Sequence, residues 1–412
     1  MSATGTNAGA GEGFKLSQLL YDTRYRGATI QVVAMFVLML AFAWLVNNVI
    51  ENLAALGKDF NFSFLWSTAG YDVNQRLLEY SSQSTHGRAA VMGILNTLVL
   101  ALVGCITATI LGVLAGVARL SKNWLVAKLM SIYVEAFRNV PVLLWIIIVS
   151  AIVNETLPSP RDFRDVETGA FVLTNRGFYF PEALFTNGLG DLDFGLFKVS
   201  IDLLAILAVL FTGLYVSSRI GKWADATQAA TGDRPNVLWY RLGVVFLPLI
   251  ALLLVLGFHF GYAELKGFNF RGGTFVRDSF IALWFALSLY TGAFIAENVR
   301  AGIQAVSKGQ TEAAFALGLQ PSRTMNLVIL PQAMRVIVPP LISQYLNLTK
   351  NTSLAIAVGY MDATGTLGGI TLNQTGREME TLLLLMAFYL IVSLSISFVM
   401  NVYNERTKLK ER

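Results

Sequence analysis

The chain has 412 residues, of which 55% are hydrophobic and only 14% are charged. A soluble globular domain carries about 25% charged residues, so this chain lacks the charge needed to cover a water-facing surface. Its net charge of +5 comes mostly from residues at the ends of apolar runs, a pattern typical of membrane topology rather than nucleic-acid binding. Cys105 is the single cysteine, which excludes a disulfide framework and a cysteine-based metal site.

Eight apolar segments are long enough to cross about 30 Å of hydrocarbon as helices. The sequence therefore predicts an all-α integral membrane protein with about eight transmembrane helices. Residues 1–27 lack the pattern of a cleaved signal peptide, so we expect the first span to stay as an anchor. In chain order the predicted spans are Ile30–Ile50, Val91–Ala118, Leu129–Val153, Val199–Ser217, Leu242–Phe260, Ser279–Ala296, Val336–Val358 and Thr381–Met400.

The orientation follows from the short loop between the second and third spans. This loop holds Arg119, Lys122 and Lys128 and no acidic residue. Short basic loops stay in the cytoplasm. An even number of spans then predicts that the N-terminal segment 1–27 and the basic tail 404–412 are both cytoplasmic.

Two further features of the apolar core leave alternatives open. Gly104, Ala108, Gly112 and Gly116 recur at steps of four on the second span, so they share one helix face. This face is either a moving contact along a pathway or static packing, and we favour packing because transmembrane helices use glycine freely. The polar outer loop of about Asn154–Lys198 either forms a small ordered cap or stays mobile.

The cytoplasmic loop after the sixth span, Lys308–Gly318, carries the clearest local signals. Thr311 is predicted to cap a helix, which places Glu312 in its first turn at the positive end of the helix dipole. Gly318 is expected to end this helix in the left-handed conformation, and Pro321 to open the next one. Such a short, rigid helix suits insertion into a groove on another protein. It is a poor active site, because its one carboxylate has no nearby histidine, cysteine or second acid.

This loop also carries a family motif. Glu312-Ala313-Ala314, Gly318 and Val328-Ile329-Leu330-Pro331 stand at fixed spacing. The pattern resembles the EAA loop of bacterial ABC importer permeases, with Val328 at a position where isoleucine is usual. The resemblance implies that Glu312, Ala313, Ala314 and Gly318 form a loop that couples to an ATPase.

Other segments resemble the polar amino-acid (His/Glu/Gln/Arg/opine) branch of that family, across roughly residues 90–153 and 272–403. They are Asn96-Thr97-Leu98, Arg138 to Leu143, Tyr290 to Arg300, Pro331-Gln332-Ala333 and Lys350 to Leu354. The resemblance implies a type I ABC importer permease core at 90–403, interrupted by a two-helix insertion at about 154–271. An extra transmembrane helix at 28–51 precedes this core. The enlarged form resembles the permeases of general L-amino-acid importers, including those for glutamate, glutamine, aspartate and asparagine.

No Gly-x-x-x-x-Gly-Lys-[Ser/Thr] phosphate loop occurs in the chain, so ATP hydrolysis is expected on a partner subunit. The resemblance implies an ATP-driven importer of L-amino acids that works by alternating access in the bacterial inner membrane. Its expected partners are an ATPase dimer that holds ATP and magnesium, a periplasmic amino-acid-binding protein and membrane lipid. A second permease, preferably a homologous chain, completes the set. We expect no catalytic residue, no metal site and no nucleic-acid partner.

Candidate residues of the substrate pathway are Lys350, Asn351, Thr352 and Ser353. A zwitterionic amino acid needs a cation for its carboxylate, and an ionisable residue at membrane depth is a candidate for that role. Lys350 either meets substrate or extends its ammonium group to the outer interface.

Three other ionisable side chains in the apolar segments are interpreted as structural. Arg138 is expected to pair with Glu135 rather than with substrate, because the two stand three residues apart. Glu297 and Arg300 have the same spacing and are expected to form a structural pair.

Two other classes of protein compete with this interpretation. A stand-alone secondary transporter also has many spans and polar residues inside the membrane, but it does not need an EAA-type loop. A membrane enzyme needs converging nucleophiles, acids or metal ligands. The two histidines, His86 and His259, are far apart, so the sequence disfavours an enzyme.

Overall fold

The computed structural model describes residues 23–55, 57, 59–164, 169–195 and 198–407. Within these ranges it contains eight helices that are long and apolar enough to cross a membrane, as the sequence predicts. Most of the predicted N-terminal segment and the last five residues of the basic tail lie outside the described residues. The chain divides into two units, 1–62 and 63–412.

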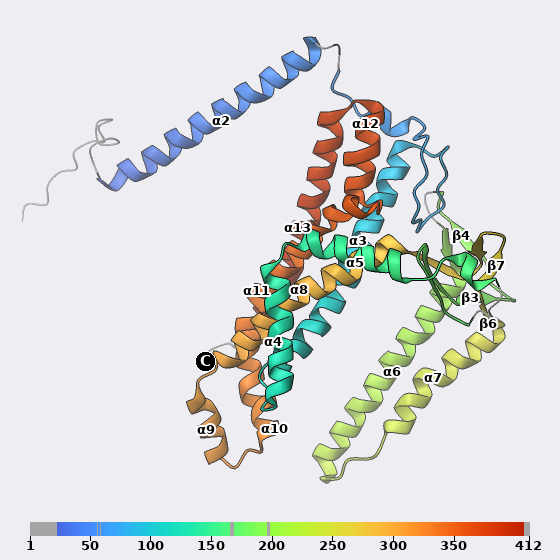
Figure 1. The fold of residues 1–412 in the computed structure, drawn as a ribbon. Helices are drawn as coiled ribbons and strands as arrows, with labels where there is room; N and C mark the ends of the chain where they lie inside the picture. The colour runs from blue at the N-terminus through green and yellow to red at the C-terminus, as the bar shows by residue number, and fades with distance from the viewer. Residues whose placement is uncertain (1–22, 56, 58, 165–168, 196–197, 408–412) are drawn as a thin grey trace, which may run out of the picture. The chain divides into compact units, whose positions relative to one another are not determined.

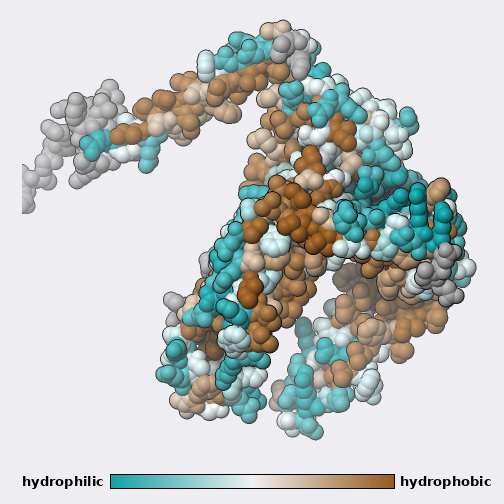
Figure 2. All heavy atoms as spheres, in the orientation of Figure 1, coloured by the Kyte–Doolittle hydropathy of each residue, from teal (hydrophilic) through white to brown (hydrophobic). Residues whose placement is uncertain are grey.

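The first unit is described by a single long helix, α2 (Thr23–Ala55). Figure 2 shows α2 as hydrophobic along most of its length. None of the residues in its most apolar window is buried within the chain, which is the surface expected of a helix surrounded by lipid. At its C-terminal end Asn47 donates a 2.7 Å hydrogen bond to Glu51. The extra N-terminal span is thus present as a helix.

The second unit is built around helix α8, whose apolar window is 61% buried. The helices that surround it are α3, α4, α5 and α11, and α11 in turn packs on α13 (Figure 1). Their bounds are α3 His86–Ala118, α4 Trp124–Asn139, α5 Val142–Thr156, α8 Asp278–Gln304, α11 Leu330–Asn351 and α13 Glu378–Thr407.

The small residues of α3 are contact points with α8 and α11. A Cβ added at Gly112 would lie 2.6 Å from the Cβ of Ile295, and one at Gly116 would lie 2.7 Å from the carbonyl oxygen of Ala296. No side chain fits at such distances, so glycine lets the two backbones approach closely. The stripe therefore forms a close helix–helix contact.

The predicted third span is wrong as a single helix. The structure divides it into α4 and α5, which meet at an angle (Figure 1). Between them Val140 has extended dihedral angles of φ −114° and ψ 134°. Pro141 causes the break, because proline disfavours the helical conformation of the residue before it and has no N–H to continue the helix.

The insertion forms an antiparallel hairpin of α6 (Ile201–Thr231) and α7 (Leu238–Val255). Glycine again allows the contact, since a Cβ at Gly213 would lie 3.1 Å from the Cα of Val245. Helix α6 runs well beyond the predicted end of the fourth span. The predicted fifth span ends too late, because residues 258–260 already belong to a strand. The tip that joins α6 to α7 is hydrophilic (Figure 2).

The loops at the other end of the hairpin form an ordered cap of short strands in the described residues. One three-stranded antiparallel sheet has the order β1-β2-β9, with Phe178 opposite Val276, and the other strands pair as β3-β6, β4-β5 and β7-β8. Val172, Tyr179, Ala263 and Phe270 form its small core. The strands are β1 Val172–Thr174, β2 Gly177–Phe180, β3 Glu182–Phe185, β4 Asp191–Asp193, β5 Lys198–Ser200, β6 Phe258–Gly261, β7 Glu264–Lys266, β8 Asn269–Arg271 and β9 Thr274–Arg277.

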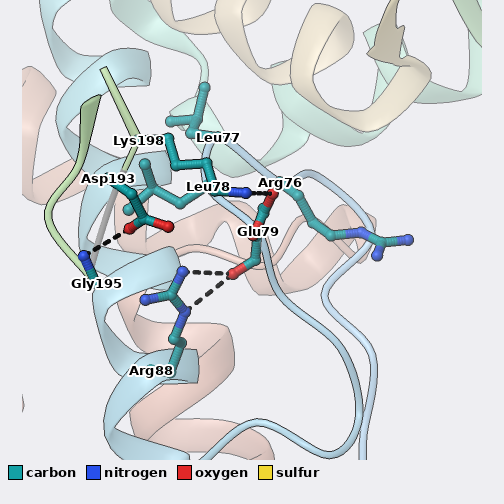
Figure 3. A pocket seen from close by; sticks show the side chains of 8 residues that line it. All are labelled: Arg76, Leu77, Leu78, Glu79, Arg88, Asp193, Gly195 and Lys198. Atoms are coloured by element: carbon teal, nitrogen blue, oxygen red, sulfur yellow. Dashed lines mark hydrogen bonds and ion pairs between the residues drawn. The ribbon is translucent and has the colours of Figure 1, made fainter. Parts of the chain in front are cut away.

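A charged pocket of about 350 Å³ lies where this cap meets the loop before α3 (Figure 3). Lys198 of β5 forms a 2.9 Å ion pair with Glu79, and this pair raises the pKa of the Lys198 ammonium group. The backbone carbonyl of Glu79 accepts two hydrogen bonds from Arg88, at 2.9 and 2.7 Å. The ion pair attaches the insertion to the core, and the bonds from Arg88 hold the loop that carries Glu79.

Candidate functional site

The predicted coupling loop is helix α9 (Lys308–Ala316), which follows α8 after a short connection. The prediction that Thr311 caps this helix is wrong. Ser307 is the N-cap residue, with extended dihedral angles of φ −61° and ψ 141°, because the chain already turns two residues beyond the end of α8. Thr311 and Glu312 therefore lie inside α9, and Glu312 is in its second turn.

The end of α9 has the predicted form. Gly318 takes a left-handed φ of 77°, and its N–H donates a 2.9 Å bond to the carbonyl of Phe315, while the N–H of Leu319 bonds to Ala314 at 3.1 Å. Such bonds satisfy the last carbonyls of a helix, and the left-handed turn favours glycine. Pro321 then opens α10 (Pro321–Thr324), as predicted.

One face of α9 packs against neighbouring segments of the chain, and the other face is exposed. Ala314 is only 4% exposed, and α9 packs against α10 and the π-helical turn η3 (Met325–Ile329) that leads into α11. On the other side Glu312 is exposed, Phe315 is 48% exposed and Leu317 is 82% exposed. A rigid helix with two protruding apolar side chains and a carboxylate is suited to binding in a groove.

Glu297 joins three helices above this loop. Its carboxylate pairs with Arg119 of α3, with Arg300 of its own helix α8, and at 3.8 Å with Arg138 of α4. The prediction that Arg138 pairs with Glu135 is wrong, because the turn of α4 that carries Arg138 lies over α8, where its guanidinium also stacks 5.5 Å from the ring of Phe294. The predicted pair of Glu297 and Arg300 is present.

The seventh predicted span, Val336–Val358, is present, and the helical run is interrupted directly after its end. After α11 the chain forms a 3-10 helix, η4 (Thr352–Val358). Gly359 ends this helix in the left-handed conformation, with φ 68°. It continues as a π-helical segment, η5 (Thr364–Thr371), and a short α12 (Leu372–Thr375). Transporters commonly place binding sites where membrane helices are interrupted in this way.

A hydroxyl of α13 connects the end of this span with the segment that follows it. The Tyr389 hydroxyl donates to Asp362 at 3.3 Å and lies 3.2 Å from the hydroxyl of Thr364 and 3.5 Å from that of Thr352. The other Asp362 oxygen accepts the N–H of Gly365 at 2.8 Å. The sequence analysis did not select Asp362 or Tyr389, although an isolated acid between apolar segments is a signal that could have found them.

The four predicted pathway residues lie at this interruption, but only one presents a charged group. Lys350 is exposed, and its ammonium group has no ion pair or hydrogen bond with the residues that the structure describes. Asn351 is half-buried. Thr352 is fully buried and donates to the carbonyl of Thr349 at 2.7 Å. Ser353 donates to the carbonyl of Lys350 at 2.7 Å.

The depth of Lys350 can be read from its neighbours on α3. Leu348 packs on Gly104, where an added Cβ would lie 3.2 Å from Leu348 Cδ2, and the Tyr345 hydroxyl lies 2.7 Å from that of Thr109. Helix α3 has 33 residues, so a hydrocarbon layer about 30 Å thick, centred on it, covers roughly residues 92–112. With the layer placed in this way, Lys350 is near its middle.

Comparisons with known proteins identify the family. The family described as "Binding-protein-dependent transport system inner membrane component" matches residues 236–409. The glutamate/glutamine/aspartate/asparagine transport system permease protein BztB of Rhodobacter capsulatus is 56% identical over 97% of this chain and 98% of its own length. The general L-amino acid transport system permease protein AapQ of Rhizobium johnstonii is 42% identical, covering 98% and 97%. A putative amino-acid ABC transporter permease, YhdX of Escherichia coli, is 43% identical, covering 93% and 94%.

In the described part of the chain, eight helices suited to crossing a membrane and the helix α9 between the sixth and seventh of them fit a multi-pass permease subunit. The chain belongs to the binding-protein-dependent transport system inner membrane components, the permease subunits of ABC importers. In this family the permease is the transmembrane subunit, and ATP is hydrolysed by a partner subunit.

Proposed function

We propose that this permease imports L-amino acids, with glutamate, glutamine, aspartate and asparagine as the expected range. The observation that carries this proposal is the 56% identity, over nearly the whole of both chains, to a permease named for those four substrates. The similarity extends through the insertion and the extra N-terminal span, which fits an importer of the same enlarged type.

In this proposal α9 inserts into a groove on an ATPase subunit. The exposed Glu312, Phe315 and Leu317 make the contact, with the small exposed Ala313 beside them, while the buried Ala314 packs on the supporting segments and Gly318 ends the helix. Movement of α9 is passed to α11 through α10 and η3, since these segments are consecutive in the chain. Closure of the ATPase dimer then switches the helices between outward-open and inward-open arrangements.

The orientation and partners follow from the same proposal. An ATPase partner requires α9 to be cytoplasmic, and the parity of eight spans gives both termini the same side. Arg219, Lys222 and Arg234 near the tip of the α6–α7 hairpin support this orientation. The cap of strands then faces the periplasmic binding protein that delivers substrate. A homologous second permease completes the complex, and ATP and magnesium are held by the ATPase.

Lys350 is the proposed cation for the substrate carboxylate. An exposed lysine at the middle of the membrane, with no partner among the described residues, is costly unless it faces water or an anion. Its side chain is positioned by the interruption that Asp362 and Tyr389 hold in place. Asn351 lies beside it, whereas Thr352 and Ser353 support the turn through their bonds to the backbone.

Co-purification tests the ATPase contact. The chain is expressed with its neighbouring genes and purified as wild type, as Glu312→Arg and as Gln228→Arg, a control that introduces the same side chain at an exposed position of α6. We expect a stoichiometric ATPase with the wild type and the control, and none with folded Glu312→Arg. Retention of the ATPase by Glu312→Arg contradicts the proposed contact. A folded wild-type chain that never retains an ATPase, yet moves solute in liposomes, favours a secondary transporter instead.

A further inference from the structure

Helix α11 exposes a regular stripe that none of its packing partners covers. The exposed positions stand at steps of four, three, four and three, so they share one face of the helix. They are Val336, Pro340, Ser343, Asn347 and Lys350. The opposite face packs against α8, α3 and α13 and contains the buried residues Ala333, Ile337, Val338, Leu348 and Thr349.

The stripe changes character along the helix. Val336 and Pro340, nearer to α9, are apolar, whereas Ser343, Asn347 and Lys350 are polar or charged. The side chains of these three residues make no hydrogen bond or ion pair within the described part of the chain. Together they offer a hydroxyl, an amide with both donors and an acceptor, and an ammonium group with three donors.

These polar groups lie at a depth where lipid does not accept them. Tyr345 and Leu348, which alternate with them along α11, contact Thr109 and Gly104 of α3, within the roughly twenty-residue part of α3 that a hydrocarbon layer about 30 Å thick covers. An unpaired amide or charge facing hydrocarbon carries a large free-energy cost, because nothing there replaces its hydrogen bonds to water.

Apart from Ser395 of α13, whose hydroxyl donates to the carbonyl of Ile391, the exposed side chains of α3 and α13 at this depth are mainly apolar, which distinguishes the stripe. Exposed side chains at the same level of α3 and α13 are large hydrocarbons suited to lipid. They include Leu98, Leu102, Ile106 and Ile110 on α3, and Met386, Leu390, Ile391 and Leu394 on α13.

We propose that Ser343, Asn347 and Lys350 line the water-filled translocation pathway and bind the polar groups of the amino acid as it passes. This inference rests on the proposed import of amino acids. Lys350 binds the carboxylate that every amino acid carries, and Asn347 and Ser343 hydrogen-bond to the remaining polar groups. The pathway then runs along α11 from the interrupted region towards the end that carries α9.

Cysteine accessibility in the assembled transporter tests this assignment. In a Cys105→Ala background that retains import, single Ser343→Cys, Asn347→Cys and Lys350→Cys variants are treated with a charged, membrane-impermeant methanethiosulfonate reagent. Leu102→Cys and Leu394→Cys, at exposed apolar positions of α3 and α13, are the matched controls for lipid-facing positions. Only complexes that retain their ATPase are compared.

We expect the three stripe positions to react at least about tenfold faster than the two controls, because the thiolate that reacts forms in water and not in hydrocarbon. Glutamate or glutamine should slow the reaction at the stripe. Reaction as slow as at the controls overturns the pathway assignment and indicates a stripe sealed against lipid or a partner. Fast reaction that no amino acid slows overturns the substrate contacts. Either failure leaves the ATPase contact of α9 intact, because that contact is established beforehand in each complex.

A second pair of variants does not depend on cysteine chemistry. Asn347→Leu suits a lipid-facing position, whereas Asn347→Gln keeps the amide. On a pathway, Asn347→Leu lowers import at least about tenfold, the effect of losing 1.4 kcal/mol, and Asn347→Gln retains most of it. Unchanged or improved import by Asn347→Leu overturns the inference.

Discussion

Gly112 of α3 lies directly against Ile295 of α8, so close that a methyl group at Gly112 would stand 2.6 Å from the Ile295 Cβ and 2.9 Å from the carbonyl oxygen of Gly292. Because one of these neighbours is a backbone atom, a change of one side-chain rotamer cannot relieve the clash that a methyl group would cause. The tight association of α3 with the central helix therefore depends on the absence of a side chain at this position.

Gly112→Val should destabilise the folded protein by about 2–3 kcal/mol, since an overpacked core forces backbone shifts. The measurement is thermal unfolding of the detergent-purified chain. Gly309→Ala is the control, because nothing lies within 4 Å of a Cβ at that position, and alanine favours its helix. An unchanged unfolding temperature for Gly112→Val would mean that the two helices can separate without penalty.

Glu297→Gln should lower stability by about 2 kcal/mol, because it leaves Arg119 and Arg300 half-buried without their counter-charge. This figure is below that of a fully buried pair, since water reaches part of the cluster. Glu135→Gln is the control on an exposed face of α4 and should have no effect. Equal unfolding temperatures for the two variants would contradict a structural role for Glu297.

Leu317→Ser should weaken ATPase binding without changing stability, because Leu317 is 82% exposed and packs on nothing that the structure describes. Loss of an apolar anchor at the centre of an interface commonly costs about 2 kcal/mol. Titration of the purified permease with the ATPase measures the effect, with thermal unfolding as the control. An unchanged affinity would remove Leu317 from the contact and leave Glu312 and Phe315 to be tested alone.

Tyr389→Phe should destabilise the folded protein by about 1–2 kcal/mol, because it removes the hydroxyl shared by Asp362, Thr364 and Thr352 and leaves a buried carboxylate with fewer donors. Import should fall as well, since the position of Lys350 depends on this turn. Tyr403→Phe on the exposed end of α13 is the matched control. Wild-type import by Tyr389→Phe would show that the hydroxyl does not shape the pathway.

Lys350→Met should raise the KM for amino-acid import by about 10- to 100-fold, the effect of losing a hydrogen bond to a charged group worth about 1.5–3 kcal/mol. Lys350→Arg keeps the positive charge and should lose less. Import into proteoliposomes measures both variants, and co-purified ATPase serves as the check on assembly. If Lys350→Met imports normally, its charge faces a partner chain or the headgroups and not the substrate.

The sequence could predict the features that depend on local chemistry. Eight apolar segments mark the spans, and Gly318 and Pro321 mark the end of α9 and the start of α10, because these signals reside in single residues. The break at Pro141 was also a local signal, but the length of the surrounding apolar run outweighed it. Ser307 and Thr311 are both good caps, so the true start of α9 could not be chosen from residue type alone.

The remaining features depend on tertiary packing. Arg138 has an acid three residues away in sequence, yet it meets Glu297 of another helix, a partner that no spacing rule identifies. The periodicity of Ser343, Asn347 and Lys350 is visible in the sequence. Which side of α11 is covered depends on α3, α8 and α13, and hence on the fold. Adjacency in sequence therefore points to the residues next to Lys350, whereas the exposed polar residues recur once per helical turn.

Helix α11 carries Pro339 and Pro340 in its interior, between the end that leads to α9 and the polar stripe. Neither proline can donate a hydrogen bond, so the carbonyls of Arg335 and Val336 lack their usual helical partners. A helix bends most readily at such a point, because no backbone hydrogen bond has to break. The two ends of α11 can therefore move by different amounts. A displacement of α9 can tilt the part of α11 before Pro339, while the part that carries Ser343 to Lys350 rotates less. The sensitivity of transport to nucleotide would then be set at this pair of prolines, which by the ~1.5 Å rise per residue lies about 5 Å along the helix from Ser343 and about 15 Å from Lys350.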